Sequence, residues 1–349
     1  SLGKCMYANS GHILSRYAFI FLTCVDFPAP SKPSRTTSMT IDFSDGDFEV
    51  NQYFFQFAKI FNFCLFLFKI NVIMGNKADR NIQVMGIVNL TDDSFFAGSR
   101  NLRADGTFDE ELFGGRIVNM LESGADILDL GACSTRPGSD SISEEEEWKL
   151  LEPALHILAS EHPEVRFSID TFRPSVVSRA FDIGGPFVVN DVSGGCEDMG
   201  RLLGRLHLPY IAMHTRGTPK NMQSLTDYDN VTEAVREFFE GIAAEADRHG
   251  VKDWILDPGF GFAKTVEQNW QLLREMSVLQ EFGKDILVGL SRKSFLFRPL
   301  GITPADALPA TQVADFIALQ NGADILRVHD VAEAVRTVKL YRLFNQASA

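Results

Sequence analysis

The stretch Trp254-Ile-Leu-Asp-Pro-Gly-Phe-Gly-Phe-Ala-Lys-Thr265 is typical of a strand, a loop and the start of a helix. Its apolar run ends at a carboxylate, Asp257, and a Pro-Gly turn follows. In parallel α/β proteins, ligands are bound at the carboxyl ends of the strands. We therefore expect Asp257 to be functional, and we ask whether other strands of the chain end in the same way.

Composition sets bounds on the class of protein. The chain has 349 residues, 45% of them hydrophobic, and a formal net charge of −13. That negative charge argues against nucleic acid and against an anionic membrane surface as partners. The five cysteines show neither metal-binding nor disulfide-framework spacing. A cytoplasmic protein that acts on small molecules is expected.

The first 73 residues differ from the rest of the chain. They are rich in Phe, and the apolar segment 53–73 is interrupted by Lys, Asn and Gln, which makes it a poor membrane-spanning helix. No cleavage site of a signal peptide follows it. We expect residues 1–73 to be an extension, either disordered or translated from an upstream segment, with the start of the protein proper at Met74.

From residue 74 onward, apolar strands alternate with helical segments. Strands are predicted at residues 82–88, 127–130, 165–169, 187–189, 210–213, 254–256, 286–289 and 325–326. Helices are predicted at 110–122, 174–181, 231–249 and 331–344, and Ser143 is expected to cap another that begins with four glutamates. This alternation, over a length close to that of one (β/α)8 barrel, predicts a TIM barrel over 74–349. An open, doubly wound sheet is the competing architecture.

Polar residues follow nearly every predicted strand. In chain order they are Asn89, Thr135, Arg136, Asp170, Asn190, His214, Asp257, Lys293, Arg327 and His329. Strand ends of a barrel meet at one mouth, so we expect these side chains to converge. The acceptors and amides suit the donor-rich edge of a heterocycle, whereas the cations suit a phosphate-bearing substrate. Neutral oxygens such as those of Asn89 could hold a hard cation.

Several residues allow a second interpretation. The sequence around Lys264 lacks the spacing of a nucleotide-binding phosphate loop, and Lys264 is expected to be a solvated lysine. Cys133 is expected to be a small loop residue, because no histidine is placed to activate it. His214 is equally consistent with a functional role and with a structural role at the barrel rim.

At these positions the sequence resembles the dihydropteroate synthase family of pterin-binding barrels. The matching motifs, in family order, are Met85-Gly-Ile-Val-Asn-Leu-Thr-Asp-Asp-Ser-Phe95, Gly131-Ala-Cys-Ser-Thr-Arg-Pro-Gly138, Ser168-Ile-Asp-Thr171, Val189-Asn-Asp-Val-Ser-Gly-Gly195, Met213-His-Thr-Arg-Gly-Thr-Pro219, Leu256-Asp-Pro-Gly-Phe-Gly-Phe262, Gly289-Leu-Ser-Arg-Lys-Ser-Phe295 and Arg327-Val-His329. They cover residues 82 to 345 approximately, and residues 1–73 match nothing in the family.

The resemblance implies a transferase of folate biosynthesis. Its reaction condenses 6-hydroxymethyl-7,8-dihydropterin pyrophosphate with para-aminobenzoate, and it releases pyrophosphate and dihydropteroate. The carbon–oxygen bond is expected to break first, which leaves a pterin-stabilised cation for the arylamine to attack. The resemblance further implies Mg²⁺ as cofactor, a homodimer and sensitivity to sulfonamides.

The same resemblance assigns a role to each site residue. Asp170, Asn190, Asp257 and Lys293 look like the pterin site, and Asn89 looks like the Mg²⁺ ligand. Thr135, Arg327 and His329 resemble the pyrophosphate contacts. Arg136, Phe262 and Ser294, together with Asp93, resemble the parts that enclose para-aminobenzoate. Asp257, Lys293, Asp93 and Arg136 are the expected catalytic residues.

Three positions depart from the family pattern. Asp92 stands where Pro is usual, Phe96-Ala-Gly-Ser-Arg100 replaces a Gly-rich continuation, and Cys133 replaces a Glu. These changes concern the para-aminobenzoate loops and sulfonamide sensitivity rather than the pterin or metal residues. A pterin-binding methyltransferase and a non-catalytic pterin-binding protein are the competing functions.

Overall fold

The computed structural model describes residues 80–91, 108–133 and 142–346. All of them fall within one compact unit of the chain, Asn62–Ala349. The predicted extension 1–73 and the predicted start at Met74 lie outside the described residues, as do the predicted site residues Asp93, Thr135 and Arg136.

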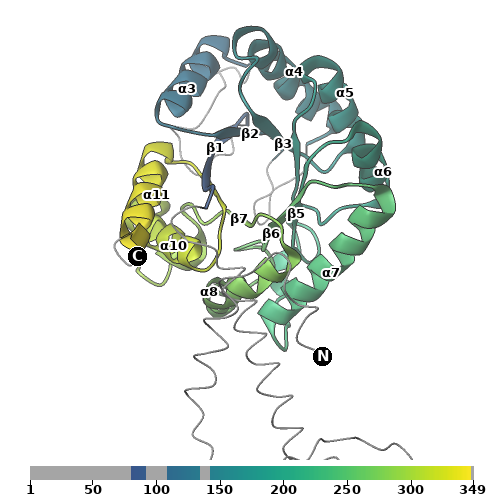
Figure 1. Cartoon of the computed structure of the whole chain (residues 1–349). Helices are drawn as coiled ribbons and strands as arrows, with labels where there is room; N and C mark the ends of the chain where they lie inside the picture. The colour runs from purple at the N-terminus through teal and green to yellow at the C-terminus, as the bar shows by residue number, and fades with distance from the viewer. Residues whose placement is uncertain (1–79, 92–107, 134–141, 347–349) are drawn as a thin grey trace, which may run out of the picture. The chain divides into compact units, whose positions relative to one another are not determined.

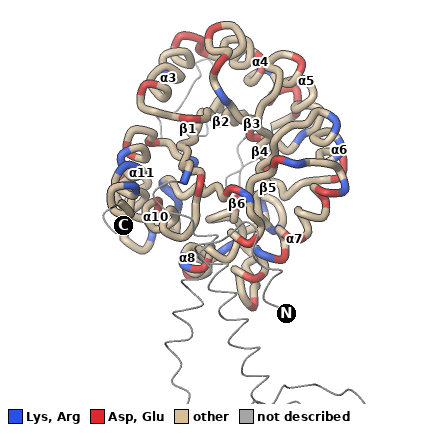
Figure 2. The backbone as a smooth tube through the Cα atoms, in the orientation of Figure 1, with Lys and Arg blue, Asp and Glu red and all other residues tan. Residues whose placement is uncertain are grey.

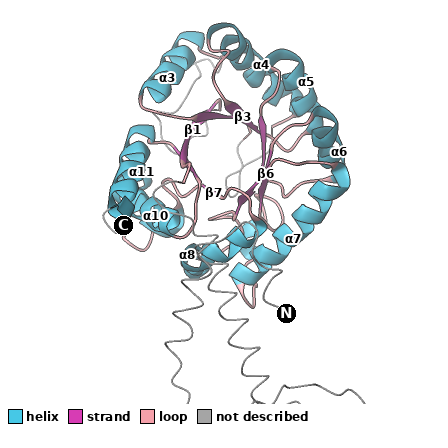
Figure 3. Cartoon of the chain, in the orientation of Figure 1, coloured by secondary structure: helices cyan, strands magenta, loops and turns pink. Residues whose placement is uncertain are grey.

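Eight parallel strands form a ring, and helices surround it (Figures 1 and 3). The strands are β1 (Gln83–Asn89), β2 (Ile127–Gly131), β3 (Phe167–Asp170), β4 (Val188–Asp191), β5 (Tyr210–Met213), β6 (Trp254–Asp257), β7 (Leu287–Val288) and β8 (Ile325–Val328). Their order in the sheet is β6-β5-β4-β3-β2-β1-β8-β7, and a parallel bridge between Leu256 and Ile286 joins the two ends. The predicted TIM barrel is confirmed, and the open doubly wound sheet is excluded.

Helices connect the strands and cover the outside of the ring. They are α3 (Glu110–Glu122), α4 (Glu144–Glu161), α5 (Pro174–Gly184), α6 (Glu197–Leu206), α7 (Val231–His249), α8 (Val266–Glu275), α9 (Ser294–Phe297), α10 (Leu308–Gln320) and α11 (Val331–Gln346), with short 3₁₀ helices η3 (Met222–Ser224), η4 (Met276–Phe282) and η5 (Pro304–Asp306). Charged residues lie on these outer helices and loops, and some also lie on the strands (Figure 2). Within the described residues, no helix combines the length and the apolar character needed to cross a membrane.

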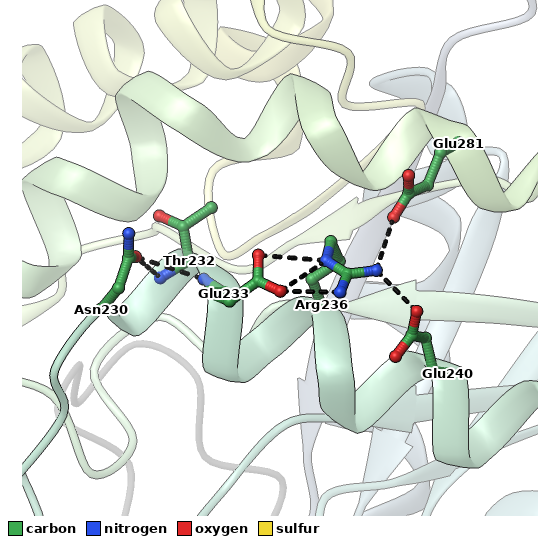
Figure 4. Close-up of polar contacts among 6 residues, drawn as sticks. All are labelled: Asn230, Thr232, Glu233, Arg236, Glu240 and Glu281. Atoms are coloured by element: carbon green, nitrogen blue, oxygen red, sulfur yellow. Dashed lines mark hydrogen bonds and ion pairs between the residues drawn. The ribbon is translucent and has the colours of Figure 1, made fainter. Parts of the chain in front are cut away.

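Local sequence signals account for where individual helices begin. Ser143 caps α4 and forms a reciprocal capping box with Glu146, as predicted from the run of glutamates. Asn230 caps α7 by accepting from the backbone N–H groups of Thr232 and Glu233 (Figure 4). One turn further along α7, the Arg236 guanidinium contacts Glu233, Glu240 and Glu281, so it ties α7 to η4 (Figure 4). Because these pairs are exposed to solvent, each contributes little to stability.

Some predicted boundaries were wrong by a few residues. The third strand starts at Phe167 rather than at Val165, because Val165 closes a turn by donating its N–H to the carbonyl of His162. Helix α5 continues three residues beyond Phe181 and ends where Gly185 adopts a φ of 67°, a left-handed conformation that favours glycine. The seventh strand is shorter than predicted, Leu287–Val288 only.

The core has two parts, one on each side of the strand ring. The larger part packs between the outer faces of the strands and the helices. The smaller part fills the inside of the barrel with Met85, Ile127, Val188, Ile211, Leu287 and Ile325, and the partly buried Ile255 packs against it. Side chains alternate along a strand, so the residue two positions further along each strand also faces the interior, one layer closer to the carboxyl ends. This apolar layer is therefore the floor on which the site is built.

The contact between α6 and α7 requires glycine at position 204. A Cβ at Gly204 would lie 1.9 Å from the backbone oxygen of His249, and backbone cannot move aside as a flexible side chain can. We predict that Gly204→Ala lowers the free energy of unfolding by about 2 kcal/mol or more, because the helices must separate. On the exposed surface of α7, a Cβ added at Gly241 would have no other atom within 4 Å. Gly241→Ala is the matched control and is expected to stabilise the protein by about 0.5–1 kcal/mol. Equal effects of the two substitutions in urea-unfolding experiments would contradict this packing.

Candidate active site

The second interior layer of the barrel is polar. Two positions beyond the apolar floor residues stand Asp129 on β2, Asn190 on β4, Asp257 on β6 and Arg327 on β8, and β3 adds Asp170. The carboxylates and Asn190 are all buried. Strands distant in sequence thus bring together four of the predicted site residues, as expected from the alternation of side chains.

Arg327 is the centre of this layer. Its guanidinium contacts the Asp129 carboxylate, with 2.6 Å between Nε and Oδ2, and lies 2.9 Å from Oδ2 of Asp170. Burial lowers the pKa of Arg327, but the two carboxylates outweigh burial and raise it above its ordinary value. The arginine therefore remains charged and compensates two buried acids.

Asp129 is a site residue that the sequence interpretation missed. Its side chain accepts hydrogen bonds from Ser168 Oγ at 2.5 Å and from Asn190 Nδ2 at 3.2 Å, in addition to those from Arg327. It was missed because it lies within β2 rather than at the strand end. Counting two residues on from the apolar Ile127 would have found it.

Asp129 and Arg327 form hydrogen bonds with Asn190 and Asp170, and one acceptor oxygen of each of these two residues remains without a partner within the described structure. Oδ1 of Asp170 and Oδ1 of Asn190 are buried and have no hydrogen-bond partner within the described structure. Burial raises the pKa of Asp170, while Arg327 opposes this shift and Asp129 adds to it. A buried acceptor without a partner costs about 1–3 kcal/mol, which a ligand with N–H donors would recover. This edge of the barrel is suited to a donor-bearing ring.

Asp257 and Lys293 form the opposite side of the site. The Asp257 carboxylate accepts from the N–H of Gly259 at 2.8 Å, and burial raises the pKa of Asp257 against the opposing effect of Lys293. Burial lowers the pKa of Lys293 to about 8, while Asp257 opposes the shift. The Lys293 ammonium donates to the carbonyl of Phe260, and it lies 4.7 Å from the centre of the Phe262 ring. Phe262 therefore stands beside Lys293.

Arg292 holds the loop that carries Lys293. It has a φ of 55°, which is unfavourable for a residue with a side chain, and its guanidinium makes paired hydrogen bonds of 2.9 Å to Asp330. It also donates to the carbonyls of Pro304 and Ala305. The predicted contact residue Ser294 opens α9 directly after Lys293. Arg292 thus serves the site by positioning its neighbour, a role that the sequence motif did not reveal.

Two further predicted residues lie at the mouth above this layer. His329 Nδ1 is 3.0 Å from Ser291 Oγ, so the loops after β7 and β8 are joined. Asn89 ends β1 in register with Gly131 of β2. No group of three or more His, Cys, Asp or Glu side chains suited to a metal occurs among the described residues. A site with Asn89 as one protein oxygen fits Mg²⁺, because this cation is commonly held by few protein groups together with substrate phosphate and water.

The structure corrects the expectation for Lys264 and clarifies His214. Lys264 is buried, with 4% of its surface exposed, and is not a solvated loop lysine. Its Nζ lies 2.9 Å from Nδ1 of His214, which is itself buried. Cys133 is a buried, free cysteine whose pKa is raised by burial, which agrees with the expectation of an unreactive loop residue.

Comparison with known proteins identifies the family. A family of pterin binding enzymes matches residues 85–329. The dihydropteroate synthase of Escherichia coli is 36% identical over 262 residues, which cover 74% of this chain and 89% of that enzyme. The chain belongs to the dihydropteroate synthase family.

Other relatives agree. A folic acid synthesis protein of Pneumocystis carinii is 39% identical over 267 residues; the match covers 74% of this chain but only 35% of that longer protein. Crystal structures of dihydropteroate synthases give the same result. The Yersinia pestis enzyme, in a sulfonamide drug complex, superposes with a TM-score of 0.70 at 34% identity and covers 76% of this chain and 95% of that one. The Thermus thermophilus enzyme, in complex with 4-aminobenzoate, has a TM-score of 0.66 at 34% identity with the same coverage. The expectations of a dihydropteroate synthase and of a transferase are confirmed.

Proposed function

We propose that the barrel mouth condenses 6-hydroxymethyl-7,8-dihydropterin pyrophosphate with para-aminobenzoate. The observation that carries this proposal is the pair of buried, uncommitted acceptors on Asp170 and Asn190, opposite Asp257. The amino-pyrimidinone edge of a pterin offers several N–H donors in one plane, and planar acceptors give such an edge a direction. Asp170, Asn190, Asp257 and Lys293 are thus the proposed pterin contacts.

Three of the predicted site residues are proposed to contact the pyrophosphate group, and Arg327 would do so from the layer in which it also pairs with Asp129 and Asp170. Arg327 and His329 lie at the end of β8, and Thr135 belongs to the loop after β2, outside the described residues. A multiply charged leaving group needs positive charge that is in place before the bond breaks. Mg²⁺ held through Asn89 would neutralise part of the pyrophosphate charge when bound.

Para-aminobenzoate is proposed to bind nearer to the barrel mouth than the pterin, against Phe262 and Ser294. Arg136 and Asp93, which lie outside the described residues, are proposed to complete this subsite. The bound 4-aminobenzoate and the bound sulfonamide belong to the Thermus and Yersinia enzymes. Because this chain is 34% identical to each enzyme, it is proposed to bind the same arylamine and to be inhibited by sulfonamides that compete with it.

The proposed chemistry is a substitution at the pterin methylene carbon. The bond from this carbon to the pyrophosphate oxygen breaks, and the electron pair leaves with pyrophosphate. The resulting cation is delocalised over the pterin, and the buried carboxylate of Asp257 stabilises it. The arylamine nitrogen then bonds to the carbon and releases one proton. No structural observation favours the methyltransferase or the non-catalytic alternative, and the relatives named above are synthases or a folic acid synthesis protein.

The reaction assay tests this proposal with a matched pair of variants. We predict Mg²⁺-dependent pyrophosphate release by the full chain, and its loss in Asp257→Ala while the circular dichroism spectrum is retained. Asp253, exposed just before the opposite end of β6, provides the control, and Asp253→Ala is expected to keep wild-type turnover. An active Asp257→Ala enzyme would show that Asp257 is not the pterin anchor. Absence of pyrophosphate release by the wild type would overturn the proposed function.

A homodimer is proposed from an apolar surface on α10 and α11, which pack side by side (Figure 1). Leu340, Leu343 and Phe344 are 58–61% exposed and form one stripe along α11. Val313 on α10 is 60% exposed, and the ring of Phe316 from α10 contacts that of Phe344. Adjacent exposed apolar side chains of this size are typical of a surface that binds a partner.

Light scattering during size-exclusion chromatography tests the dimer. The wild type is expected to have the mass of two chains, and Leu343→Glu the mass of one, because a charge in an apolar interface must be desolvated. Leu300, equally exposed at 61% but in the turn after α9, provides the control. Leu300→Glu should remain dimeric, and a dimeric Leu343→Glu variant would exclude this surface as the interface.

A further inference from the structure

Lys264 makes three short polar contacts although it is buried. Its Nζ lies 2.9 Å from the carbonyl oxygen of Gly259, 3.1 Å from that of Phe262 and 2.9 Å from Nδ1 of His214. An ammonium has three N–H donors and no acceptor, so all three donors are used. Two of these bonds remain within the loop after β6, and the third connects that loop to the end of β5.

The backbone of this loop requires support from side chains. Gly259, Gly261 and Ala263 have φ values of 69°, 82° and 48°, and Ala263 occupies a conformation that is unfavourable for a residue with Cβ. Gly259 approaches the fifth strand so closely that a Cβ there would lie 1.9 Å from the carbonyl oxygen of His214. Such a loop persists only where side chains hold its polar groups in place.

Two lysines and one asparagine provide that support. The carbonyl of Phe260 accepts from Lys293, and the N–H of Gly261 donates to Asn269 at 2.6 Å. The carbonyls on either side, those of Gly259 and Phe262, both accept from Lys264. Lys293 is assigned to the pterin, whereas Lys264 contacts only the loop and His214 among the contacts described. Lys264, which belongs to this loop, therefore holds the backbone that carries Phe262 and ties it to His214.

We propose that Lys264 is a positioning residue for the arylamine substrate, acting through the loop carbonyls and His214 to hold Phe262 at the second-substrate site. The assignment of an arylamine substrate rests on the proposed function, whereas the support of the loop by Lys264 does not. Lys264 does not reach the reacting atoms. Its loss is expected to weaken arylamine binding while the pterin contacts on β3 and β4 remain in place.

The charge state of Lys264 makes this support dependent on pH. Burial lowers its pKa to about 7; Asp257 opposes the shift, and Lys293 and Arg216 contribute to it. Burial together with Lys264 and Arg216 lowers the pKa of His214 to about 2, so the imidazole is neutral and can accept. Below about pH 7 the ammonium satisfies all three acceptors. Above it the neutral amine keeps two N–H donors and has one lone pair, so its contacts with the two carbonyls and with His214 are no longer charge-assisted and become weaker.

Steady-state kinetics of full-length Lys264→Met tests the proposal. The KM for para-aminobenzoate is expected to rise about tenfold or more, since hydrogen bonds from a charged donor are lost. The KM for the pterin pyrophosphate is expected to rise by a smaller factor, because Asp170 and Asn190 lie on β3 and β4, away from this loop. In the wild type the KM for para-aminobenzoate should rise between about pH 6 and pH 8.5. In Lys264→Met the rise near pH 7 should be absent, and only the part near pH 8 that belongs to Lys293 should remain. Lys149→Met removes an exposed lysine of α4 and should match the wild type at every pH.

Hydrogen exchange measures the loop itself, without a substrate. The peptide that spans residues 257–265 is expected to exchange faster in Lys264→Met than in the wild type, while peptides from β3 and β4 are unchanged. Unchanged exchange in this peptide, or an unchanged KM for para-aminobenzoate in an active variant, would overturn the inference. If the loop exchanges faster in the variant but the wild type releases no pyrophosphate, only the proposed function would be rejected. The support of the loop by Lys264 would still be confirmed.

Discussion

The buried pairing of Arg327 with Asp129 and Asp170 is the interaction on which the site depends. A guanidinium and two carboxyl groups in a barrel interior are costly unless they are paired, and the single guanidinium contacts both carboxyl groups. Asp129 in turn accepts from Asn190, so the orientation of the amide is determined by the same charge network. As a consequence, one oxygen of Asp170 and one of Asn190 have no partner within the described structure and face the interior. The electrostatic arrangement that stabilises this layer also produces the acceptor edge proposed to bind the pterin.

A second constraint acts on the other side of the barrel. The loop after β6 carries Phe262, and Asp257 stands at its start. It follows an unfavourable backbone course that Lys264, Lys293 and Asn269 hold in place. The loop after β7 is held in a similar manner, because Arg292 adopts a left-handed conformation and is fixed by Asp330. In both loops a buried cation contacts backbone or carboxylate oxygens and so fixes the backbone next to a predicted site residue, Phe262 in one loop and Lys293 in the other. Lys264, Asn269 and Arg292 thus hold these loops, whereas Asp257 and Phe262 are proposed to contact the substrates, and Lys293 has both roles.

The sequence predicted the barrel well because the barrel depends on periodic patterns. Short apolar strands that end in polar residues define both the floor and the mouth, and this places Asp170, Asn190, Asp257 and Arg327 in one layer. Asp129 could not be recognised from strand ends, since it lies inside an apolar strand and its importance depends on a partner 198 residues away. The burial of Lys264 was equally invisible, because a loop lysine looks solvated until the path of the chain is known. Roles that depend on tertiary proximity are the part that local sequence cannot supply.

The most direct test of the central claim is the affinity of the Asp129→Asn variant for 6-hydroxymethyl-7,8-dihydropterin, measured by calorimetry with the full chain. This substitution keeps the shape of the side chain but removes the charge that holds Arg327 and orients Asn190. We expect the free energy of unfolding to fall by about 3 kcal/mol and the pterin affinity to fall about tenfold or more. Glu145→Gln, in an exposed ion pair with Arg179, should change both quantities little. An Asp129→Asn protein with wild-type pterin affinity would contradict the claim that this buried pairing creates the acceptor edge.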